Sequence, residues 1–315
     1  MPTSQPAEPT PSVPLLARMG ISGDLRDLDG GLAAGLSFGL FLNWGVVMEQ
    51  PAANITFWQM VRLGEDEGVK ISWEELEKAV ANQPGSAWIV GNEPDVIWQD
   101  NVTPERYAEL YHEVYTFVTE RDPTAQVAIG GITQPTPLRL AYLDRVLTAY
   151  ETQFGQVMPV DIWTVHAFIL REEAGSWGVD IPPGMSEQEG VLYEIADHDD
   201  FTIFTENIFI FRRWLKDRGY GDRPLAVTEY GILMPFDYGF PPEAVAVFMR
   251  QSFDFFLTAR DEEIGYSLDD YRLVQWWFWY SLHDPDLYVT GNLYDRQTGE
   301  LTPLGKEWQE YVDSR

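Results

Sequence analysis

The sequence predicts a single α/β domain folded as a (β/α)8 barrel, the TIM barrel. The chain has 315 residues, of which 45% are hydrophobic, and a barrel of this class needs roughly 250 residues. Eight short apolar segments alternate with segments in which apolar residues recur at helical spacing. This alternation is typical of βαβ units and a parallel sheet. An open, doubly wound sheet is the alternative that the pattern leaves possible.

The expected strands are short apolar runs, several of which end at polar residues. We place the eight strands at residues 18–22, 36–43, 55–62, 87–91, 126–132, 160–166, 225–229 and 274–281. In a parallel barrel the carboxyl ends of all strands face one mouth, where the active sites of such barrels lie. The residues at the ends of the fourth and seventh strands are therefore the first candidates for a functional site.

Several segments between these strands have helical signals. Thr103 is a suitable N-cap, and Pro104 a suitable first-turn residue, for a helix that reaches about residue 121. Residues 72–75 have the spacing of a capping box, and residues 242–257 form a further predicted helix. Residues 170–200 are too long for an ordinary connection, so we expect them to form a loop over the barrel mouth.

The N-terminal segment differs in composition from the rest. Residues 1–14 are polar and proline-rich, which predicts a disordered leader before a barrel at residues 15–315. Removal of an export signal or lipid anchor would explain such a leader, so we expect a secreted or cell-surface protein, with a cytoplasmic location left open. No apolar run is long enough for membrane insertion of the barrel.

Composition restricts the partners and the chemistry. The formal net charge is −29, and such a surface repels phosphate backbones and anionic lipids. We therefore expect no nucleic-acid partner and a neutral substrate, although the charge also serves solubility alone. The chain has no cysteine and only 4 His, with no paired spacing typical of metal ligands. We expect no metal and no other cofactor.

Two glutamates end strands of this barrel. Glu93 follows the apolar run of the fourth strand, and Glu229 ends the seventh. Two carboxyl groups at one mouth push their pKa values apart, and glycoside hydrolysis needs one carboxylic acid and one carboxylate. The alternative is that each glutamate is held in a structural ion pair, for example Glu93 with Arg62.

The residues around both glutamates resemble the signatures of clan A, a large clan of retaining glycosidases with TIM barrels. The two motifs are Asn92-Glu93-Pro94 and Thr228-Glu229-Tyr230-Gly231. The resemblance implies that Glu93 is the acid/base, that Glu229 is the nucleophile, and that Asn92 binds the 2-hydroxyl of the sugar. The pattern is most similar to small bacterial barrels related to the clan's β-1,3-glucanase and xylosidase-like families.

Further candidates lie at the same mouth. His166 ends the sixth strand and is similar to the clan's position beside the nucleophile; the alternative is a core histidine bonded to a backbone carbonyl. The resemblance implies a tryptophan of the eighth strand under the sugar, for which we favour Trp279, with Trp277 on the same face. Core packing is the alternative for each aromatic residue. The other expected substrate contacts are Asn43, Trp44, Arg62, which would hold Glu229 ionised, Asp95, Trp98 and Tyr230.

The sequence thus predicts a retaining hydrolase of a neutral β-linked glycan, acting on an oligo- or polysaccharide. Three alternatives stay open: a carbohydrate-binding barrel without activity, a transglycosylase with the same residues, and an unrelated barrel enzyme such as a lyase. We expect the loops at residues 170–200 and 233–242 to decide the shape of the cleft.

Overall fold

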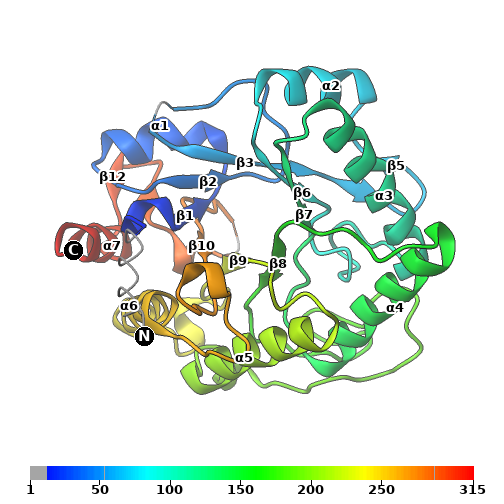
Figure 1. Ribbon diagram of the computed structural model, residues 1–315. Helices are drawn as coiled ribbons and strands as arrows, with labels where there is room; N and C mark the ends of the chain where they lie inside the picture. Colours follow the sequence, from blue (N-terminus) through cyan, green and yellow to red (C-terminus); the bar gives the residue numbers. More distant parts are fainter. Residues whose placement is uncertain (1–12, 53, 287) are drawn as a thin grey trace, which may run out of the picture.

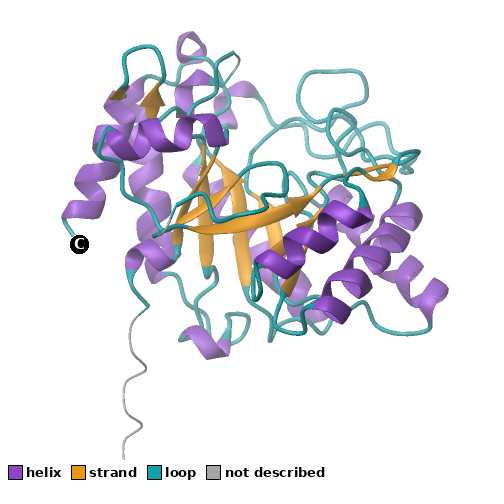
Figure 2. Cartoon of the chain, turned by 90° about the horizontal axis from the view of Figure 1, so that it is seen from above, coloured by secondary structure: helices purple, strands orange, loops and turns teal. Residues whose placement is uncertain are grey.

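The protein is a barrel of eight parallel strands surrounded by helices (Figures 1 and 2). The computed structural model describes residues 13–52, 54–286 and 288–315. The barrel strands are β1 (Met19–Ser22), β2 (Leu40–Leu42), β3 (Thr56–Val61), β6 (Ala87–Val90), β7 (Gln126–Ile129), β8 (Trp163–His166), β9 (Leu225–Tyr230) and β10 (Trp276–Tyr280). Each lies at one of the eight predicted strands, so the predicted barrel is confirmed.

The sheet closes between its two ends. Its order is β7-β6-β3-β2-β1-β10-β9-β8, and neighbouring strands pair in parallel. Two parallel bridges, Ala128 to Ile162 and Ile132 to Val165, join β7 and its extension to β8. The carboxyl ends of the fourth and seventh strands, β6 and β9, therefore face the same mouth, as a barrel requires.

The helices follow one another around the barrel in chain order (Figure 1). They are α1 (Leu25–Ala33), α2 (Trp73–Asn82), α3 (Pro104–Arg121), α4 (Pro137–Phe154), α5 (Phe201–Asp217), α6 (Pro242–Thr258) and α7 (Pro303–Asp313). Two antiparallel hairpins are added, β4 (Leu63–Gly64) with β5 (Gly68–Val69) and β11 (Tyr294–Asp295) with β12 (Glu300–Leu301). Residues 43–55 connect β2 to β3 without a described helix, and this loop carries Trp44 to the mouth.

Two helices begin where predicted, but the hydroxyl groups of their N-cap residues form different hydrogen bonds. Ser72 accepts a hydrogen bond from the Glu75 amide and donates one to the Glu75 carboxylate. Thr103 precedes α3 as predicted, yet its hydroxyl donates to Glu65 instead of capping the helix. Among the described residues, no helix combines the length and the apolarity needed to cross a bilayer.

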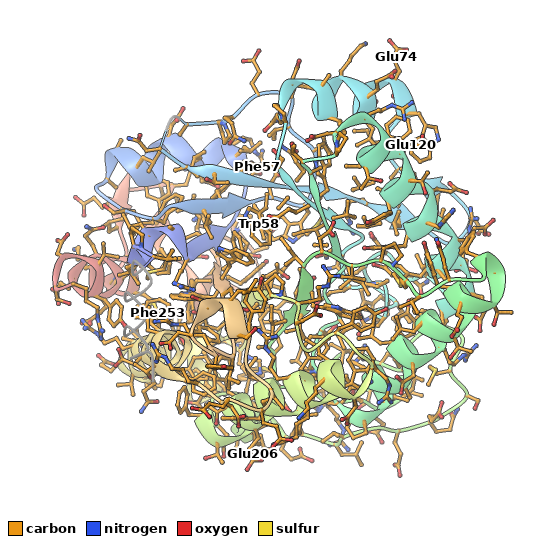
Figure 3. The ribbon with its side chains drawn as sticks, in the orientation of Figure 1. Phe57, Trp58, Glu74, Glu120, Glu206 and Phe253 are labelled. Atoms are coloured by element: carbon orange, nitrogen blue, oxygen red, sulfur yellow. The ribbon has the colours of Figure 1, made fainter. Side chains whose placement is uncertain are left out.

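The core has two layers separated by the strands. One side chain in two on each strand points into the barrel, where Trp58 and Phe278 are packed edge to face. The alternate residues pack against the helices, as Trp277 does against Phe253 of α6. Figure 3 shows Glu74, Glu120 and Glu206 at the rim of the molecule, outside this core.

The predicted leader lies almost wholly outside the described residues. Of residues 1–14, only Val13 and Pro14 are described, and both are exposed.

Candidate active site

Glu93 and Glu229 meet at the barrel mouth, with His166 between them. Nδ1 of His166 lies 2.8 Å from Oε1 of Glu93, and Nε2 lies 3.6 Å from Oε1 of Glu229. The three side chains come from the ends of β8, β6 and β9, and all are buried. His166 was expected either to act in the site or to be a core histidine bonded to a backbone carbonyl. The geometry supports the first, because the ring contacts both carboxyl groups.

The backbone around Glu93 turns sharply after β6. Gly91 has φ 88° and Glu93 has φ 42°, a left-handed conformation that a non-glycine residue rarely adopts. The Glu93 amide donates a hydrogen bond to the carbonyl of Gly131, 3.1 Å away. A Cβ on Gly131 would lie 2.7 Å from Cδ2 of His166. Gly131 is therefore a site residue that sequence reasoning missed, and its pairing with Gly130 was the available signal.

Trp44 holds the other carboxyl group. Its indole Nε1 donates a hydrogen bond of 2.7 Å to Oε1 of Glu229. The Trp44 ring also packs against Tyr280, the last residue of β10, with ring centroids 5.9 Å apart. These contacts place Trp44 beside Glu229 and Tyr280, and the substrate contact expected of Trp44 stays a prediction.

The charges of the three groups act on one another. Burial raises the pKa of Glu229, and the negative charge of Glu93 adds to this, whereas His166 and the Trp44 indole oppose it. For His166, burial lowers the pKa, but the attraction of Glu229 and Glu93 outweighs it, so the pKa is raised. Both shifts mean that this cluster binds a proton more tightly than the separate groups would in water.

A pocket of about 240 Å³ opens above the two glutamates; we call it the catalytic pocket. Loops after five barrel strands contribute to its wall. Its aromatic lining residues are Trp98, Phe168, Trp177, Tyr280 and Tyr288, and its other lining residues include Gln99, Thr133, Leu170, Val179, Leu233 and Met234. The two loops expected to shape the cleft, at residues 170–200 and 233–242, both line it. Trp98 lines the pocket and is 72% exposed, and its role in a neighbouring subsite stays a prediction.

The aromatic residues predicted from β9 and β10 are not in the pocket. Trp277 and Trp279 are fully buried on the helix side of the barrel, and Nε1 of Trp279 donates to the carbonyl of Gly291. Tyr230 is also buried there and packs edge to face against Trp279. The prediction that Trp277 and Trp279 face the sugar site is therefore wrong. Tyr280, which alternation places on the opposite face, lines the pocket in their place.

Arg62 and Asp95 each form an ion pair with another residue near the mouth. The Arg62 guanidinium forms an ion pair with Asp100, 2.6 Å away, and does not contact either catalytic candidate. It lowers the pKa of Glu229 only as the last of several causes. Asp95 is buried in an ion pair with Arg139, so it does not line the pocket. Arg62 thus has a minor effect on Glu229, and the substrate contacts expected of Arg62 and Asp95 stay predictions.

Neither of the two predicted asparagines is among the described residues that line the catalytic pocket. Asn92 is buried, and its side-chain amide donates to Gln99, 3.3 Å away. Within the described part of the chain, Oδ1 of Asn92 and Oδ1 of Asn43 are buried without a hydrogen-bond partner. The sugar contacts expected of them remain predictions.

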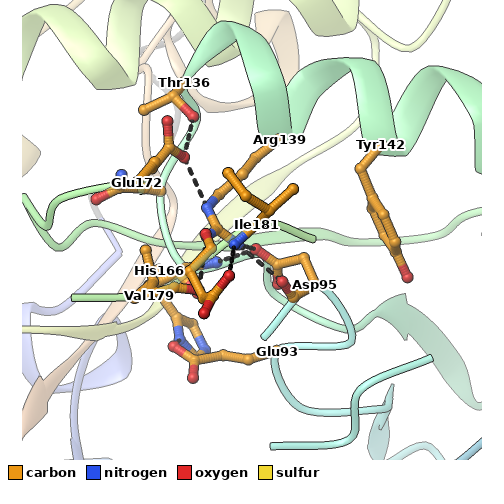
Figure 4. A network of polar contacts seen from close by, with 12 residues as sticks. Glu93, Asp95, Thr136, Arg139, Tyr142, His166, Glu172, Val179 and Ile181 are labelled. Atoms are coloured by element: carbon orange, nitrogen blue, oxygen red, sulfur yellow. Dashed lines mark hydrogen bonds and ion pairs between the residues drawn. The ribbon is translucent and has the colours of Figure 1, made fainter. Parts of the chain in front are cut away.

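A buried ion network supports the loop that carries Glu93 (Figure 4). Arg139 of α4 contacts Asp95 and Glu172, with its Nε 2.8 Å from Oε1 of Glu172. It also donates to the carbonyls of Val179 and Asp180. One guanidinium therefore ties α4 both to the loop after Glu93 and to the loop that contains Val179, which lines the catalytic pocket.

His198 forms a second link between pocket loops. Its Nδ1 lies 2.8 Å from the carbonyl oxygen of Ile169, and its Nε2 accepts from the Leu233 amide at 2.9 Å. These partners require the neutral ring with its proton on Nδ1. Burial lowers the pKa of His198 to about 4, which is consistent with a neutral ring.

No protein-family model matches the chain, and no curated protein does either. Solved structures match it over nearly its whole length. A GH128 (subgroup II) endo-β-1,3-glucanase from Pseudomonas viridiflava is 17% identical, with 93% of this chain and 97% of that chain covered and a TM-score of 0.62. The chain has the fold of TIM-barrel β-1,3-glucanases.

Two further structures extend this likeness. A GH128 (subgroup III) curdlan-specific exo-β-1,3-glucanase from Blastomyces gilchristii, in complex with glucose, is 19% identical. The match covers 94% of this chain and 99% of that chain, with a TM-score of 0.59. A GH128 (subgroup I) endo-β-1,3-glucanase from Amycolatopsis mediterranei, in complex with laminaritriose, is 16% identical. The match covers 93% of this chain and 98% of that chain, with a TM-score of 0.60. The resemblance to TIM-barrel glycosidases is thus confirmed for the fold, and the activity is argued from the site.

Proposed function

We propose that this protein is a retaining glycoside hydrolase that cleaves a neutral β-linked glucan, and that β-1,3-glucan is its substrate. One observation carries the proposal: two buried glutamates contact opposite nitrogens of His166 at the floor of an aromatic-lined pocket. A carboxyl pair of this kind is what double displacement at a sugar needs. The choice of β-1,3-glucan follows the printed activities of the structural neighbours.

The proposed reaction has two steps. In the first, a carboxylate oxygen of Glu229 attacks the anomeric carbon while Glu93 gives its proton to the leaving glycosidic oxygen. In the second, Glu93 removes a proton from water, whose oxygen attacks the same carbon and releases Glu229. His166 contacts Glu93 directly and stabilises the ionised form of Glu229. The Trp44 hydrogen bond holds Glu229 during both steps.

The lining of the pocket supports a neutral sugar. No basic residue is among the described residues that line it, whereas two of them are glutamates. An anionic sugar would meet no positive partner and would be repelled. The aromatic rings offer flat apolar faces for the C–H faces of sugar rings, and Gln99 and Thr133 offer hydrogen-bonding groups. Since polysaccharides do not cross membranes unaided, we also propose that the protein is secreted or displayed at the cell surface.

The test is a screen of the wild type against β-1,3-glucan, mannan, xylan and aryl glycosides, with Glu229→Ala as the matched control. We expect hydrolysis of β-1,3-glucan, loss of turnover in the variant, and a first-formed product with the same anomeric configuration as the substrate. An inverted product, or a carboxyl separation in the inverting range of about 6.5–9.5 Å instead of about 5–5.5 Å, would contradict retention.

The alternatives give different results in the same screen. Binding of glucans without hydrolysis would favour a carbohydrate-binding barrel. Longer oligosaccharides among the products would favour a transglycosylase. If Glu229→Ala stayed active, the assignment of the nucleophile would be wrong.

A further inference from the structure

A second pocket lies beside the catalytic pocket and takes no part in the proposed reaction. Its volume is about 340 Å³, compared with about 240 Å³ for the catalytic pocket. It is formed by the chain that follows β10, up to the start of α7, together with Phe236 and Pro242. The hairpin and the two helices that contribute to it lie on the same side of the barrel (Figure 1).

The two pockets share a thin wall. Tyr288 lines the catalytic pocket and the next residue, Val289, lines the second. Tyr280, at the floor of the catalytic pocket, donates its hydroxyl proton to Asp284 of the second pocket at 2.8 Å. Thr290 of the second pocket likewise donates to the carbonyl of Met234, which lines the first. The two pockets are therefore neighbours, linked through their common wall by these two hydrogen bonds.

The chemistry of the second pocket suits an uncharged sugar. Phe236, His283 and Tyr294 provide flat rings, and Gln297 and Asp295 provide polar groups. Neither lysine nor arginine is among its described lining residues, so an anionic ligand would find no strong positive partner. Among the described residues, no three His, Asp or Glu side chains are grouped as metal ligands. Rings beside hydrogen-bonding side chains are what a neutral sugar unit requires.

Several exposed aromatic side chains lie on the loops at the mouth of the barrel. Trp98, Tyr288, Phe236 and Tyr238 are 72%, 36%, 45% and 55% exposed. They lie on the loops after β6, β10 and β9, all at the carboxyl ends of the strands. Trp98 and Tyr288 line the catalytic pocket and Phe236 lines the second, so exposed aromatic rings are available at both pockets.

We propose that the second pocket binds a further stretch of the glycan chain that is cut in the catalytic pocket. The proposal takes its ligand class from the proposed function, and it makes the enzyme one that acts on polymers better than on short oligosaccharides. Binding in the second pocket holds the polymer near the catalytic carboxyl groups and raises its effective concentration there.

The experiment separates polymer binding from catalysis. Phe236→Ala and Gln297→Ala change the second pocket, and Tyr271→Ala is the matched control. Tyr271 is 40% exposed and precedes β10, so it lies at the opposite end of this strand from both pockets. Each substitution is made in the wild type and in the Glu229→Gln background. The wild-type series is assayed on laminaritriose and on insoluble β-1,3-glucan, and the Glu229→Gln series is tested for co-sedimentation with the insoluble glucan.

We expect Phe236→Ala to weaken co-sedimentation about three- to tenfold, the range for one aromatic contact. Gln297→Ala should weaken it in the same direction. Activity on the insoluble glucan should fall in parallel, while the rate on laminaritriose and the behaviour of Tyr271→Ala stay unchanged.

If the wild type hydrolyses the glucan but neither variant loses polymer binding, the second pocket is not a glycan site. Equal losses on laminaritriose and polymer would also overturn the inference, because the substitutions would then act on the catalytic pocket. If no protein hydrolyses any glucan, the proposed function fails. The second pocket would still be supported if co-sedimentation of the Glu229→Gln protein fell with Phe236→Ala.

Discussion

Nδ1 of His166 lies 2.8 Å from Oε1 of Glu93, and the same ring presents its other nitrogen to the second glutamate of the site. One imidazole thus connects the acid/base candidate to the nucleophile candidate. The charge of the ring acts on Glu229, because a positive neighbour lowers the pKa of a carboxyl group.

Replacement of His166 by Gln should shift the acidic limb of the pH profile upward. Glu229 must be ionised to attack, so activity falls as the pH drops through its pKa. His166 lowers that pKa against burial and the Glu93 charge, so its removal raises the pKa further. We expect kcat/KM to fall about 10²-fold or more on the acidic side. Profiles measured from about pH 4 to about pH 8 give the result, with His112→Gln of α3 as control. If the acidic limb of the His166→Gln profile lay at lower pH than that of the wild type, the electrostatic role of His166 would be refuted.

Trp44→Phe should lower kcat/KM while it keeps an aromatic ring at the mouth. The substitution removes the indole donor 2.7 Å from Glu229. Hydrogen bonds to charged groups contribute roughly 1.5–3 kcal/mol, so the expected loss is about ten- to a hundredfold. Steady-state kinetics on β-1,3-glucan test it, and Trp73→Phe on the outer helix α2 is the control. Unchanged kinetics would show that the Trp44 bond does not position the nucleophile.

Arg139→Met should destabilise the protein strongly. The substitution leaves the carboxylates of Asp95 and Glu172 buried without their cation, and loss of one partner of a buried pair costs about 3–5 kcal/mol. Urea unfolding measures the change. Arg145→Met is a matched control on the same helix, because the Arg145–Glu105 pair is exposed and should contribute about 1 kcal/mol or less.

In the double variant Arg139→Met with Asp95→Asn, part of the stability should return, because one buried charge is gone. A loss as small as that of Arg145→Met would mean that the network contributes little.

His198 should make the protein less stable in mild acid. The unfolded chain binds a proton at this residue below about pH 6.5, whereas in the folded protein burial lowers the pKa of His198 to about 4. The free energy of unfolding therefore decreases as pH falls from about 6.5 to about 4, by at most about 3 kcal/mol. Urea unfolding at several pH values should show a flatter dependence for His198→Gln, since a neutral amide does not titrate. An equal slope in both proteins would exclude this contribution.

The strands, their order and the two glutamates could be predicted because each depends on local sequence. An apolar run of four to eight residues marks a strand wherever it lies, and the parallel barrel brings the ends of all strands to one mouth. Glu93, Glu229, His166 and Trp98 could be placed on this basis. Trp44 could be placed near the mouth because it lies directly after the second predicted strand.

The face of each strand residue was decided by the tertiary structure. Alternation in β10 separates Trp277 and Trp279 from Tyr280, but it does not say which set points toward the pocket. The register with β1 and β9 settles this, because it turns both tryptophans toward the helices. Tyr230 could have been assigned correctly, since it follows Glu229 directly and neighbouring residues of a strand point to opposite faces.

The sequence by itself determined that two acidic side chains would lie at the mouth of a barrel, because strand periodicity and chain order are local properties. Only the tertiary structure decided which groups surround them: Arg62 with Asp100, Arg139 with Asp95, and Trp44 with Glu229. These partners are 38, 44 and 185 residues apart in the chain. Their contacts arise because closure of the barrel brings distant strand ends together, and long side chains bond to whichever opposite charge or acceptor the packing then places within reach.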